Sequence, residues 1–402
     1  MCEQEMILLK KAVIGITYFA LLSGFMLANA WAAVPIKIGV LLPLTGSNAK
    51  SGIIQKKSVL MAADEINAAG GINGKKIKLI IEDTQGKPDA GRTAIEKLIA
   101  RDKVLVIGGG FSSSVTWATI SIAQQKKIAF LVNSASADKI TEQDWEYIFR
   151  LNQPMSEHLE ALASFIKKAA TDIKSVGIVH ATALKSSSDA RKFFKKAGTL
   201  GLKMVVKESF ETGADDFRPL LTRVKAKNPD LLYVVTDDVN AAALLTRHSR
   251  ELKLNPKLFV GSATGFARPG FADIAGTASN YVACATLWNP SVPYHGAKEY
   301  NQKFIAKYNT PPTYHGAQAY AAMQVIADAL KRTKVLTPAK VRDALAKTKM
   351  TTVFGPVKFI SYNKKSRQNR LPTCLVQWID GKVEIVWPKH LATKKAIYPA
   401  PK

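Results

Sequence analysis

Three glycines followed by three serines form the chemically most suggestive segment of this chain, Gly108-Gly-Gly-Phe-Ser-Ser-Ser114, which directly follows an apolar run of strand length. Glycines let the backbone turn sharply and let a ligand approach it closely. The serines stand where a helix would begin, and a helix N-terminus presents unsatisfied N–H groups and a partial positive charge. We therefore predict an anion-binding site at Ser112 and Ser113. The alternative, that the serines only cap the helix, stays open.

The same segment fits the known enzymatic patterns poorly. A dinucleotide-binding turn needs a third glycine where Ser113 stands, and an acidic residue about twenty positions later, where the chain has 124–127 Gln-Gln-Lys-Lys. The nucleophile elbow of a hydrolase needs a closing glycine, which is also missing. The six histidines are dispersed, without metal-like spacing. The sequence therefore predicts a binding protein with no catalytic residue, no cofactor and no metal.

Two similar series of elements must position this segment. In the first series, strands are expected at 36–42, 77–82, 104–107 and 128–132, with an amphipathic helix between each strand and the next. The second series begins after 151–154 and places strands at 176–180, 204–208, 231–236 and 258–261. Such alternation predicts an α/β fold with parallel sheets covered by helices on both faces, in two lobes of like architecture.

The rest of the chain is expected to connect the two lobes again. A strand at 281–287 leads into helices over 296–308, 314–331 and 338–348, and two further strands flank the turn Asp380-Gly381. An Asp-Gly turn between apolar runs is a strong hairpin signal. Because no low-complexity linker separates the lobes, we expect the chain to return to the first lobe, cross once more, and form a hinge of several short strands. The predicted bounds are 33–152 and 285–369 for the first lobe, and 153–284 and 370–402 for the second.

The N-terminus predicts export. Lys10 and Lys11 precede the apolar run 12–27, and small residues follow, so residues 1–32 are expected to form a signal peptide cleaved before Ala33. A membrane anchor is the alternative, although the run is short for a span of ~20 residues. A mature chain of about 370 residues suits two domains.

Charge and cysteines restrict the partners. The formal net charge of +26 comes from scattered lysines, without an arginine-rich tract or a basic-aromatic block, so we predict solvated surfaces and no nucleic-acid partner. Contact with anionic lipid headgroups is the alternative use of this charge. Cys284 and Cys374 either pair or remain two separate buried thiols.

Six segments, taken in order, resemble the periplasmic solute-binding proteins of branched-chain amino acid transporters, the type I Leu/Ile/Val-binding family. The likeness covers nearly the whole mature chain and rests on the following segments: Ile38-Gly-Val-Leu-Leu-Pro-Leu-Thr-Gly46, Ala62-Ala-Asp-Glu-Ile-Asn-Ala-Ala-Gly-Gly-Ile72, Glu82-Asp-Thr-Gln85, Gly108-Gly-Gly-Phe-Ser-Ser-Ser114, Ala317-Gln-Ala-Tyr320 and Phe354-Gly-Pro-Val357. The resemblance implies two doubly wound lobes joined by three crossings, which close around a ligand in the cleft.

The resemblance also implies site residues. Ser112 would bind a ligand carboxylate through its hydroxyl and N–H, Ser134 would offer a backbone carbonyl to an amino group, and Ser136 would offer a hydroxyl. The positions agree with the physics of open α/β sheets, which bind ligands at the carboxyl ends of their strands. Phe111, Trp117 and Trp288 are candidate apolar cleft residues, with core packing as the alternative for each.

Departures from the family pattern concern ligand choice. Lys185 stands where the family places a tyrosine, Ser51 where it often places an aromatic residue, and 262–264 Ser-Ala-Thr where amino-acid binders place an acid. Lys185, expected to have no acidic partner nearby, would favour a second carboxylate, or an aromatic or dicarboxylic acid, over a zwitterion if it faces the cleft; a solvated lysine is the alternative. Asp237 or Asp238 would then bind an ammonium group, or else cap the following helix.

The expected function is that of a periplasmic, monomeric substrate-binding protein of an ABC importer. It would capture a small carboxylate-bearing solute, either an amino acid or an aromatic or organic acid, by lobe closure and deliver it to a membrane permease. The alternative is a periplasmic sensor that presents its closed state to a receptor, because both functions use the same closing motion.

Overall fold

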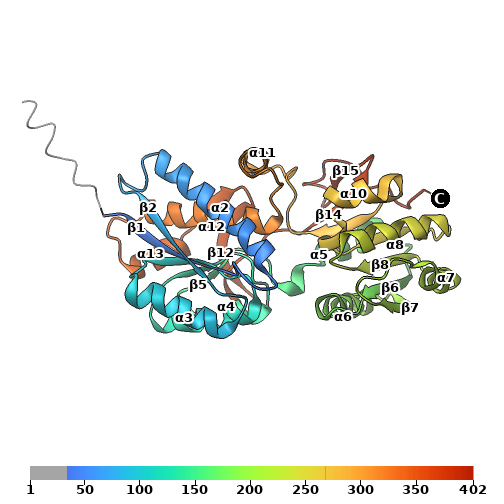
Figure 1. The fold of residues 1–402 in the computed structure, drawn as a ribbon, viewed down its shortest axis with the longest axis horizontal. Helices are drawn as coiled ribbons and strands as arrows, with labels where there is room; N and C mark the ends of the chain where they lie inside the picture. Colours follow the sequence, from blue (N-terminus) through green and yellow to red (C-terminus); the bar gives the residue numbers. More distant parts are fainter. Residues whose placement is uncertain (1–33, 268, 402) are drawn as a thin grey trace, which may run out of the picture.

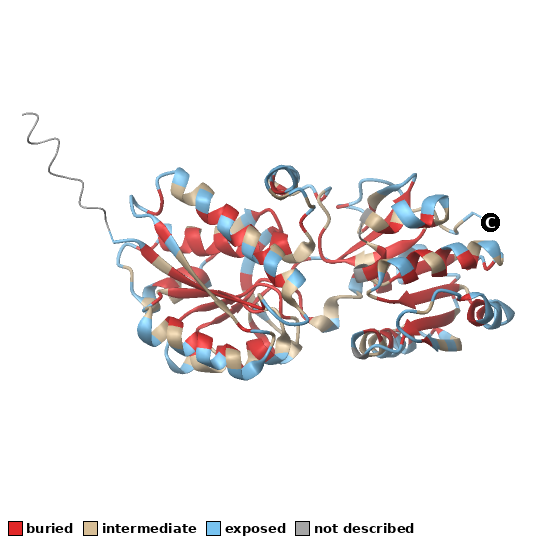
Figure 2. Cartoon of the chain, viewed as in Figure 1, coloured by how far each residue is buried: buried red, intermediate tan, exposed pale blue. Residues whose placement is uncertain are grey.

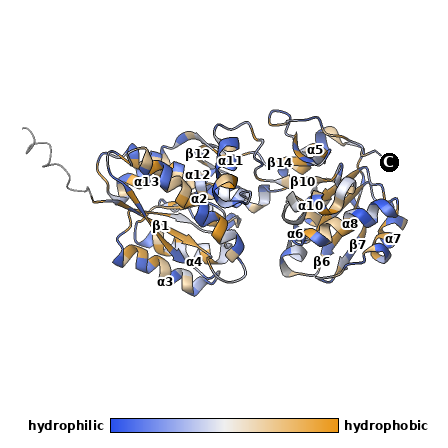
Figure 3. Ribbon diagram, turned by 45° about the horizontal axis from the view of Figure 1, so that its top comes forward, coloured by the Kyte–Doolittle hydropathy of each residue, from blue (hydrophilic) through white to orange (hydrophobic). Residues whose placement is uncertain are grey.

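Two β-sheets, each with its own helices, lie side by side along the long axis of the molecule (Figure 1). The structure is a computed structural model that describes residues 34–267 and 269–401. The predicted signal peptide, residues 1–32, lies outside the described residues. Buried residues concentrate in the strands and on the helix faces that cover them (Figure 2), and hydrophobic and hydrophilic residues alternate along the helices (Figure 3).

The first sheet has eight strands in the order β11-β12-β13-β5-β4-β3-β1-β2. Strands β1 to β5 and β13 run parallel to their neighbours in this part of the sheet, whereas β12 is antiparallel to both β11 and β13. The bounds are β1 (Ile36–Leu42), β2 (Ile77–Asp83), β3 (Val106–Gly109), β4 (Phe130–Val132), β5 (Ile148–Arg150), β11 (Lys349–Thr352), β12 (Gly355–Tyr362) and β13 (Lys365–Asn369).

The second sheet has seven strands in the order β15-β14-β10-β9-β8-β6-β7. Its strands β6 to β10 pair in parallel, and the antiparallel hairpin β14–β15 completes one edge. The bounds are β6 (Ser175–Ala181), β7 (Lys203–Phe210), β8 (Leu231–Val235), β9 (Leu258–Gly261), β10 (Ala283–Thr286), β14 (Cys374–Ile379) and β15 (Lys382–Trp387).

Helices cover both faces of each sheet. In the first lobe α2 and α12 lie on one face and α3 and α4 on the other, and in the second lobe α8 and α6 lie on opposite faces (Figure 1). The helix bounds are α2 (Ala49–Ala68), α3 (Pro88–Glu96), α4 (Ser113–Gln125), α5 (Glu160–Ala169), α6 (Leu184–Thr199), α7 (Arg218–Ala226), α8 (Val239–Glu251), α9 (Ala263–Phe266), α10 (Pro269–Ala275), α11 (Ala297–Tyr308), α12 (Tyr314–Lys331) and α13 (Pro338–Ala346). Short helices of other types are η1 (Lys97–Arg101), η2 (Asp138–Thr141), η3 (Met155–Glu157) and η4 (Gly276–Ser279).

The alternation of strand side chains explains these layers. In β1, Val40 and Leu42 pack in the cluster that contains α2 and α12, whereas Leu41 packs in the cluster that contains α3 and α4. Successive side chains of a strand point to opposite faces, so a strand that is apolar throughout is buried on both sides. In β6, Ile178 and Val179 divide in the same way between the two faces of the second sheet.

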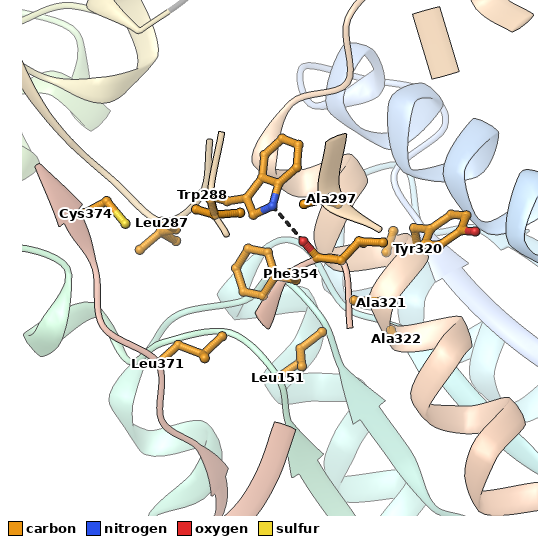
Figure 4. Packing of buried hydrophobic residues seen from close by; sticks show 14 of the residues in the cluster. Leu151, Leu287, Trp288, Ala297, Tyr320, Ala321, Ala322, Phe354, Leu371 and Cys374 are labelled. Carbon is orange, nitrogen blue, oxygen red and sulfur yellow. Dashed lines mark hydrogen bonds between the residues drawn. The ribbon is translucent and has the colours of Figure 1, made fainter. Parts of the chain in front are cut away.

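The chain crosses between the two sheets three times, after β5, after β10 and after β13. The three crossing segments pack against one another in one apolar cluster that includes Leu151, Trp288 and Leu371 (Figure 4). The indole N–H of Trp288 donates to the carbonyl oxygen of Val353 at 2.8 Å. Trp288, one of the three candidate cleft aromatics, is therefore part of the hinge core.

The observed fold confirms the predicted class, two doubly wound α/β lobes joined by three crossings. The hairpin strands 374–379 and 382–387 also lie where they were expected. Of the two readings of the cysteines, the structure has separate thiols, because Cys284 and Cys374 are both free and buried. Burial raises the pKa of the Cys374 thiol to about 12.

Candidate functional site

The turn between β3 and α4 requires its glycines. Gly109 and Gly110 have φ angles of 117° and 81°, a region that side chains rarely allow. A Cβ atom on Gly109 would lie 2.3 Å from the carbonyl oxygen of Leu41 on the neighbouring strand. The glycines therefore let the chain turn sharply at the end of β3, so that α4 begins close to the carboxyl ends of the strands.

Ser112 stands at the N-cap of α4 with an extended backbone (φ −72°, ψ 130°), but its side chain makes no capping hydrogen bond. Its Oγ instead lies 3.0 Å from the Oγ of Ser114. The first N–H groups of a helix have no acceptor within the helix. Because the Ser112 side chain accepts no hydrogen bond from them, the first N–H groups of α4 and the hydroxyls of Ser112 and Ser114 can bind an anion.

Ser113 and Ser136 come together from neighbouring strand ends. The Oγ of Ser113 accepts a hydrogen bond from the N–H of Ala137 at 3.2 Å, which ties the turn after β3 to the segment after β4. The carbonyl oxygen of Ser136 accepts from the N–H of Met155 at 2.7 Å, and Ser136 is half-buried. Three of the predicted residues, Ser112, Ser113 and Ser136, thus lie beyond the carboxyl ends of the central strands β3 and β4.

Ser134 occupies a different environment from the other predicted serines. It is 5% exposed, and its hydroxyl donates to the side-chain oxygen of Gln318 at 2.9 Å. Its backbone carbonyl, expected to receive a ligand amino group, accepts a hydrogen bond from the side-chain amide of Asn152 at 2.5 Å. Ser134 therefore supports the interior below the strand ends, and the structure does not place its hydroxyl at the surface with Ser112.

A buried polar network around Ser134 was missed by the sequence analysis. Gln55 on α2 accepts hydrogen bonds from Asn133 at 2.9 Å and from Ser134 at 3.3 Å, and the amide of Gln318 on α12 donates to Asn152 at 2.7 Å. Gln55 and Gln318 are fully buried on otherwise apolar helix faces. A glutamine between alanines in 317–320 was the available signal, because a polar residue on a core face needs a partner.

The network continues through a fully buried arginine. Arg150, the last residue of β5, donates to the Gln368 side-chain oxygen at 2.5 Å, to the Ala137 carbonyl at 2.6 Å and to the Thr141 hydroxyl at 2.9 Å. Gln368 in turn donates to the carbonyl of Asn152 at 2.7 Å. Burial lowers the pKa of the Arg150 guanidinium to about 10, so the group remains charged at neutral pH. These bonds join the first and third crossing segments to the turn that carries Ser136.

Two further aromatic residues lie near the serines in sequence. Phe111 is half-buried and makes an edge-to-face contact with the His315 ring, with ring centroids 4.9 Å apart. Trp117 stacks on Trp145 at 5.5 Å, and the Lys139 ammonium lies 4.3 Å from the Trp117 ring. Phe111 immediately precedes Ser112, so it is the candidate aromatic that lies beside the predicted anion-binding turn.

Lys185 and Asp237 form an ion pair at the carboxyl ends of β6 and β8 in the second sheet. The Lys185 ammonium lies 2.6 Å from Asp237 and 3.6 Å from Asp189. The expectation that Lys185 lacks an acidic partner is therefore wrong, because the order of strands brings Asp237 to it and Asp189 stands four residues later on the same helix. Ser262, where amino-acid binders place an acid, hydrogen-bonds Thr236 through its Oγ.

The two aspartates after β8 have different roles. The carboxylate of Asp238 accepts the N–H of Asn240 at 2.8 Å and caps α8, whereas Asp237 pairs with Lys185. An N-cap contributes about 1 kcal/mol to stability. An exposed ion pair contributes only a few tenths of a kcal/mol, and side chains of Lys185 and Asp237 are 58% and 41% exposed.

We expect Asp238→Ala to lower the free energy of unfolding by about 1 kcal/mol and Asp237→Ala by a few tenths. Urea denaturation of the two variants measures this difference, and each serves as the control for the other. Equal losses would contradict the assignment of the cap to Asp238 alone.

His158 in the first crossing segment makes stability depend on pH. Its Nε2 lies 3.2 Å from the carbonyl oxygen of Gln153, and burial lowers its pKa from 6.5 to about 4. The nearby cations Lys192 and Arg150 also lower this pKa, whereas Asp189 raises it. The neutral ring is therefore favoured in the folded state. The stability that the neutral His158 ring contributes is fully present above pH 6.5 and is lost as the pH falls towards 4.

We expect the free energy of unfolding to fall by roughly 2 kcal/mol more between pH 7 and pH 4.5 in the native chain than in His158→Gln. Carboxylates titrate equally in both proteins, so the difference isolates the histidine. Urea denaturation at the two pH values measures it. Parallel pH profiles would show that His158 takes up its proton in the folded state as readily as in the unfolded one.

Two absences complete the description of residues 34–267 and 269–401. No group of three or more histidine, cysteine or acidic side chains lies close enough to hold a metal ion. In the same ranges, no helix combines the length and the apolar character that a bilayer span requires.

Comparison with known proteins agrees with this geometry. The model of a family described as periplasmic binding protein matches residues 35–382. Among curated proteins, Leu/Ile/Val-binding protein homolog 7 of Brucella suis is 27% identical over 411 residues, which is 97% of this chain and 100% of that protein.

Solved structures show the same architecture. The substrate-binding protein LivJ of Streptococcus pneumoniae, in complex with isoleucine, has a TM-score of 0.70 and 25% identity over 88% of this chain and 100% of that one. A solute-binding protein of an ABC transporter from R. palustris, in complex with benzoate, has a TM-score of 0.69 and 19% identity, with coverage of 88% and 95%. This second likeness concerns the fold alone.

Proposed function

The chain belongs to the periplasmic binding protein family, as a substrate-binding protein of the branched-chain amino acid ABC transporter type, and on this premise we propose that it captures a small carboxylate-bearing solute and delivers it to a membrane permease. We also propose that it works as a monomer in the periplasm. The two lobes would close onto the solute. Their proposed bounds are 33–152 and 285–369 for the first lobe, and 153–284 and 370–402 for the second.

The N-terminus of α4 is the observation that carries the proposal. Ser112 leaves the helix uncapped by its side chain and keeps its hydroxyl next to that of Ser114. A carboxylate there would accept charge-assisted hydrogen bonds from the first N–H groups and from the hydroxyls. The position also follows the rule that open parallel sheets bind ligands beyond the carboxyl ends of their strands.

The second lobe supplies groups of both charges. Lys185 and Asp237 lie at strand ends of the second sheet, partly exposed and in contact with each other. A zwitterionic solute could use both groups, because Asp237 suits an ammonium group and Lys185 a carboxylate. An aromatic acid without an amino group could use only Lys185. The ion pair therefore favours an amino acid over a simple aromatic acid in the proposed cleft.

Closure follows from binding to both lobes. A ligand shifts the equilibrium towards the closed state only by the difference between its affinities for the two states. Contacts with Ser112 exist in either state, and contacts with the Lys185–Asp237 pair are gained on closure. The hinge core around Trp288 gives the two lobes a common axis for this motion.

A ligand panel with two readouts tests the proposal. Thermal unfolding of the mature chain is measured with branched-chain, polar and acidic amino acids, benzoates and dicarboxylates. A true ligand at one hundred times its dissociation constant should stabilise the protein by ~2.7 kcal/mol. Small-angle scattering should then show a smaller radius of gyration with the same ligand. A panel in which no carboxylate stabilises the chain, or in which a stabilising acid leaves the radius unchanged, would refute capture by closure.

A further inference from the structure

We propose that a groove on the antiparallel extension of the first sheet docks an extended acidic segment of a partner protein. This β11–β12 groove has a volume of about 550 Å³. Its lining includes Lys349, Thr351, Lys358 and Arg370. It lies apart from the serine turn, on strands that the ligand proposal does not use.

The charges of the β11–β12 groove are all of one sign. Lys349 and Lys358 stand directly opposite each other in the register of β11 and β12, and both are exposed. Like charges in directly opposite positions destabilise a pair of strands. Among the described residues, neither ammonium group has a carboxylate within ion-pair distance, and no lining residue is acidic. The arrangement is therefore complementary to an anion.

Arg370 extends the positive charge to the start of the third crossing. Its guanidinium lies over the Tyr362 ring at 4.9 Å, and its Nε is 4.0 Å from a carboxylate oxygen of Glu157. A contact of 4.0 Å at an exposed side chain is weak. An acidic partner could compete for Arg370 while it contacts the two lysines.

The position of β11 favours an extended partner over a compact one. β11 is the terminal strand of the eight-stranded sheet, so one edge of its backbone has no neighbouring strand. An extended peptide can add to such an edge by main-chain hydrogen bonds, while alternate side chains reach the adjoining face. Lys349 and Thr351 are the exposed, alternate residues of β11. Acidic side chains at every second position of the added strand would face this positive row.

Edge-strand lysines also serve to prevent association, and the opposite edge of the same sheet provides the control for that role. Lys75 and Lys78, next to and in β2, are exposed, and no carboxylate lies within ion-pair distance of either in the described structure. Lys78 stands opposite Lys37 in the register of β1 and β2, but neither Lys75 nor Lys78 lines the β11–β12 groove. Replacing them changes the net charge by the same amount as replacing Lys349 and Lys358.

The test is fluorescence anisotropy of the mature chain with a labelled peptide of alternating glutamate and threonine, and with its glutamine counterpart. We expect the glutamate peptide to bind at low salt and the glutamine peptide not to bind. Lys349→Glu with Lys358→Glu should weaken binding at least tenfold, whereas Lys75→Glu with Lys78→Glu should change it less than threefold. Equal weakening by both double variants, or no binding of the glutamate peptide, would overturn the proposal. Circular dichroism of the exposed-site variants confirms that they fold.

Two further experiments distinguish an acidic protein segment from other anions that could bind the β11–β12 groove. Vesicles with 30% phosphatidylserine and inorganic phosphate are tested against the same variants. Loss of vesicle binding in the Lys349→Glu, Lys358→Glu variant, with unchanged peptide binding, would assign the groove to a lipid surface and overturn the proposal. Displacement of the peptide by millimolar phosphate, but not by chloride of equal ionic strength, would assign it to a small anion and overturn the proposal as well.

Discussion

Replacing Gln368 with leucine should destabilise the first lobe by about 3 to 5 kcal/mol. Gln368 is fully buried and accepts the Arg150 Nε–H at 2.5 Å and the Thr141 hydroxyl at 3.1 Å. Leucine would fill similar space but leave a buried guanidinium donor without its acceptor. Removing one partner of a buried charged group costs more than removing a neutral pair. Urea denaturation and amide hydrogen exchange in β5 and β13 measure the loss.

A double-mutant cycle makes this expectation specific. Arg150→Met added to Gln368→Leu should recover at least about 1 kcal/mol, because the stranded charge is then absent. Gln377 in β14 is the matched control. It is a buried glutamine that hydrogen-bonds the backbone of Tyr281 and Ile397, and no charged side chain in the described part of the chain hydrogen-bonds it. Gln377→Leu should therefore add to Arg150→Met without recovery. Strict additivity in the Arg150–Gln368 cycle would contradict the role assigned to their hydrogen bond.

Ser112→Ala should weaken binding of the best carboxylate from the ligand panel about 10- to 100-fold, since a hydrogen bond to a charged group contributes about 1.5 to 3 kcal/mol. The free energy of unfolding should change little, because the Ser112 side chain makes no capping hydrogen bond. Isothermal titration calorimetry measures the affinity, and thermal unfolding without ligand measures the stability.

Ser121 on the same helix is the control for the Ser112 experiment. Its hydroxyl donates to the Ala118 carbonyl at 3.1 Å within α4, away from the helix N-terminus. Ser121→Ala should leave the dissociation constant within twofold. A Ser112→Ala variant that binds as tightly as the native chain would remove the anion site at the start of α4, and with it the main support for carboxylate capture.

The fold was predictable because its strands carry strong local signals. Residues 231–235 are apolar throughout and residues 36–42 are apolar except for Lys37, as strands buried on both faces are. Strands β5, β11, β12 and β13 were not predicted, and β13 carries no such signal. β13 reads Lys-Ser-Arg-Gln-Asn, yet four of its five residues are buried. Gln368 and Asn369 hydrogen-bond the first crossing segment, whereas Lys365 and Ser366 contact residues 138–142. Local hydrophobicity cannot reveal a strand whose burial depends on tertiary polar contacts.

The candidate site was predictable to the extent that local sequence determines it. Gly109, Gly110 and Ser112 define a strand–turn–helix unit within a few residues, so the turn could be recognised directly. The Asp237 partner of Lys185 and the Gln318 partner of Ser134 could not, although Asp189, four residues after Lys185, could have been recognised. Asp237 lies 52 residues from Lys185, and Gln318 lies 184 residues from Ser134. Only the order of strands in the folded sheets brings such residues into contact.

The common packing of Leu151, Trp288 and Leu371 means that neither half of the molecule is a separable module. Each half is assembled from two stretches of chain, so excising one would sever all three connections at once. The cut surface would be a newly bared indole and leucine side chains, which tend to aggregate in water. Truncated versions intended to hold a single half would therefore need polar replacements at these three positions.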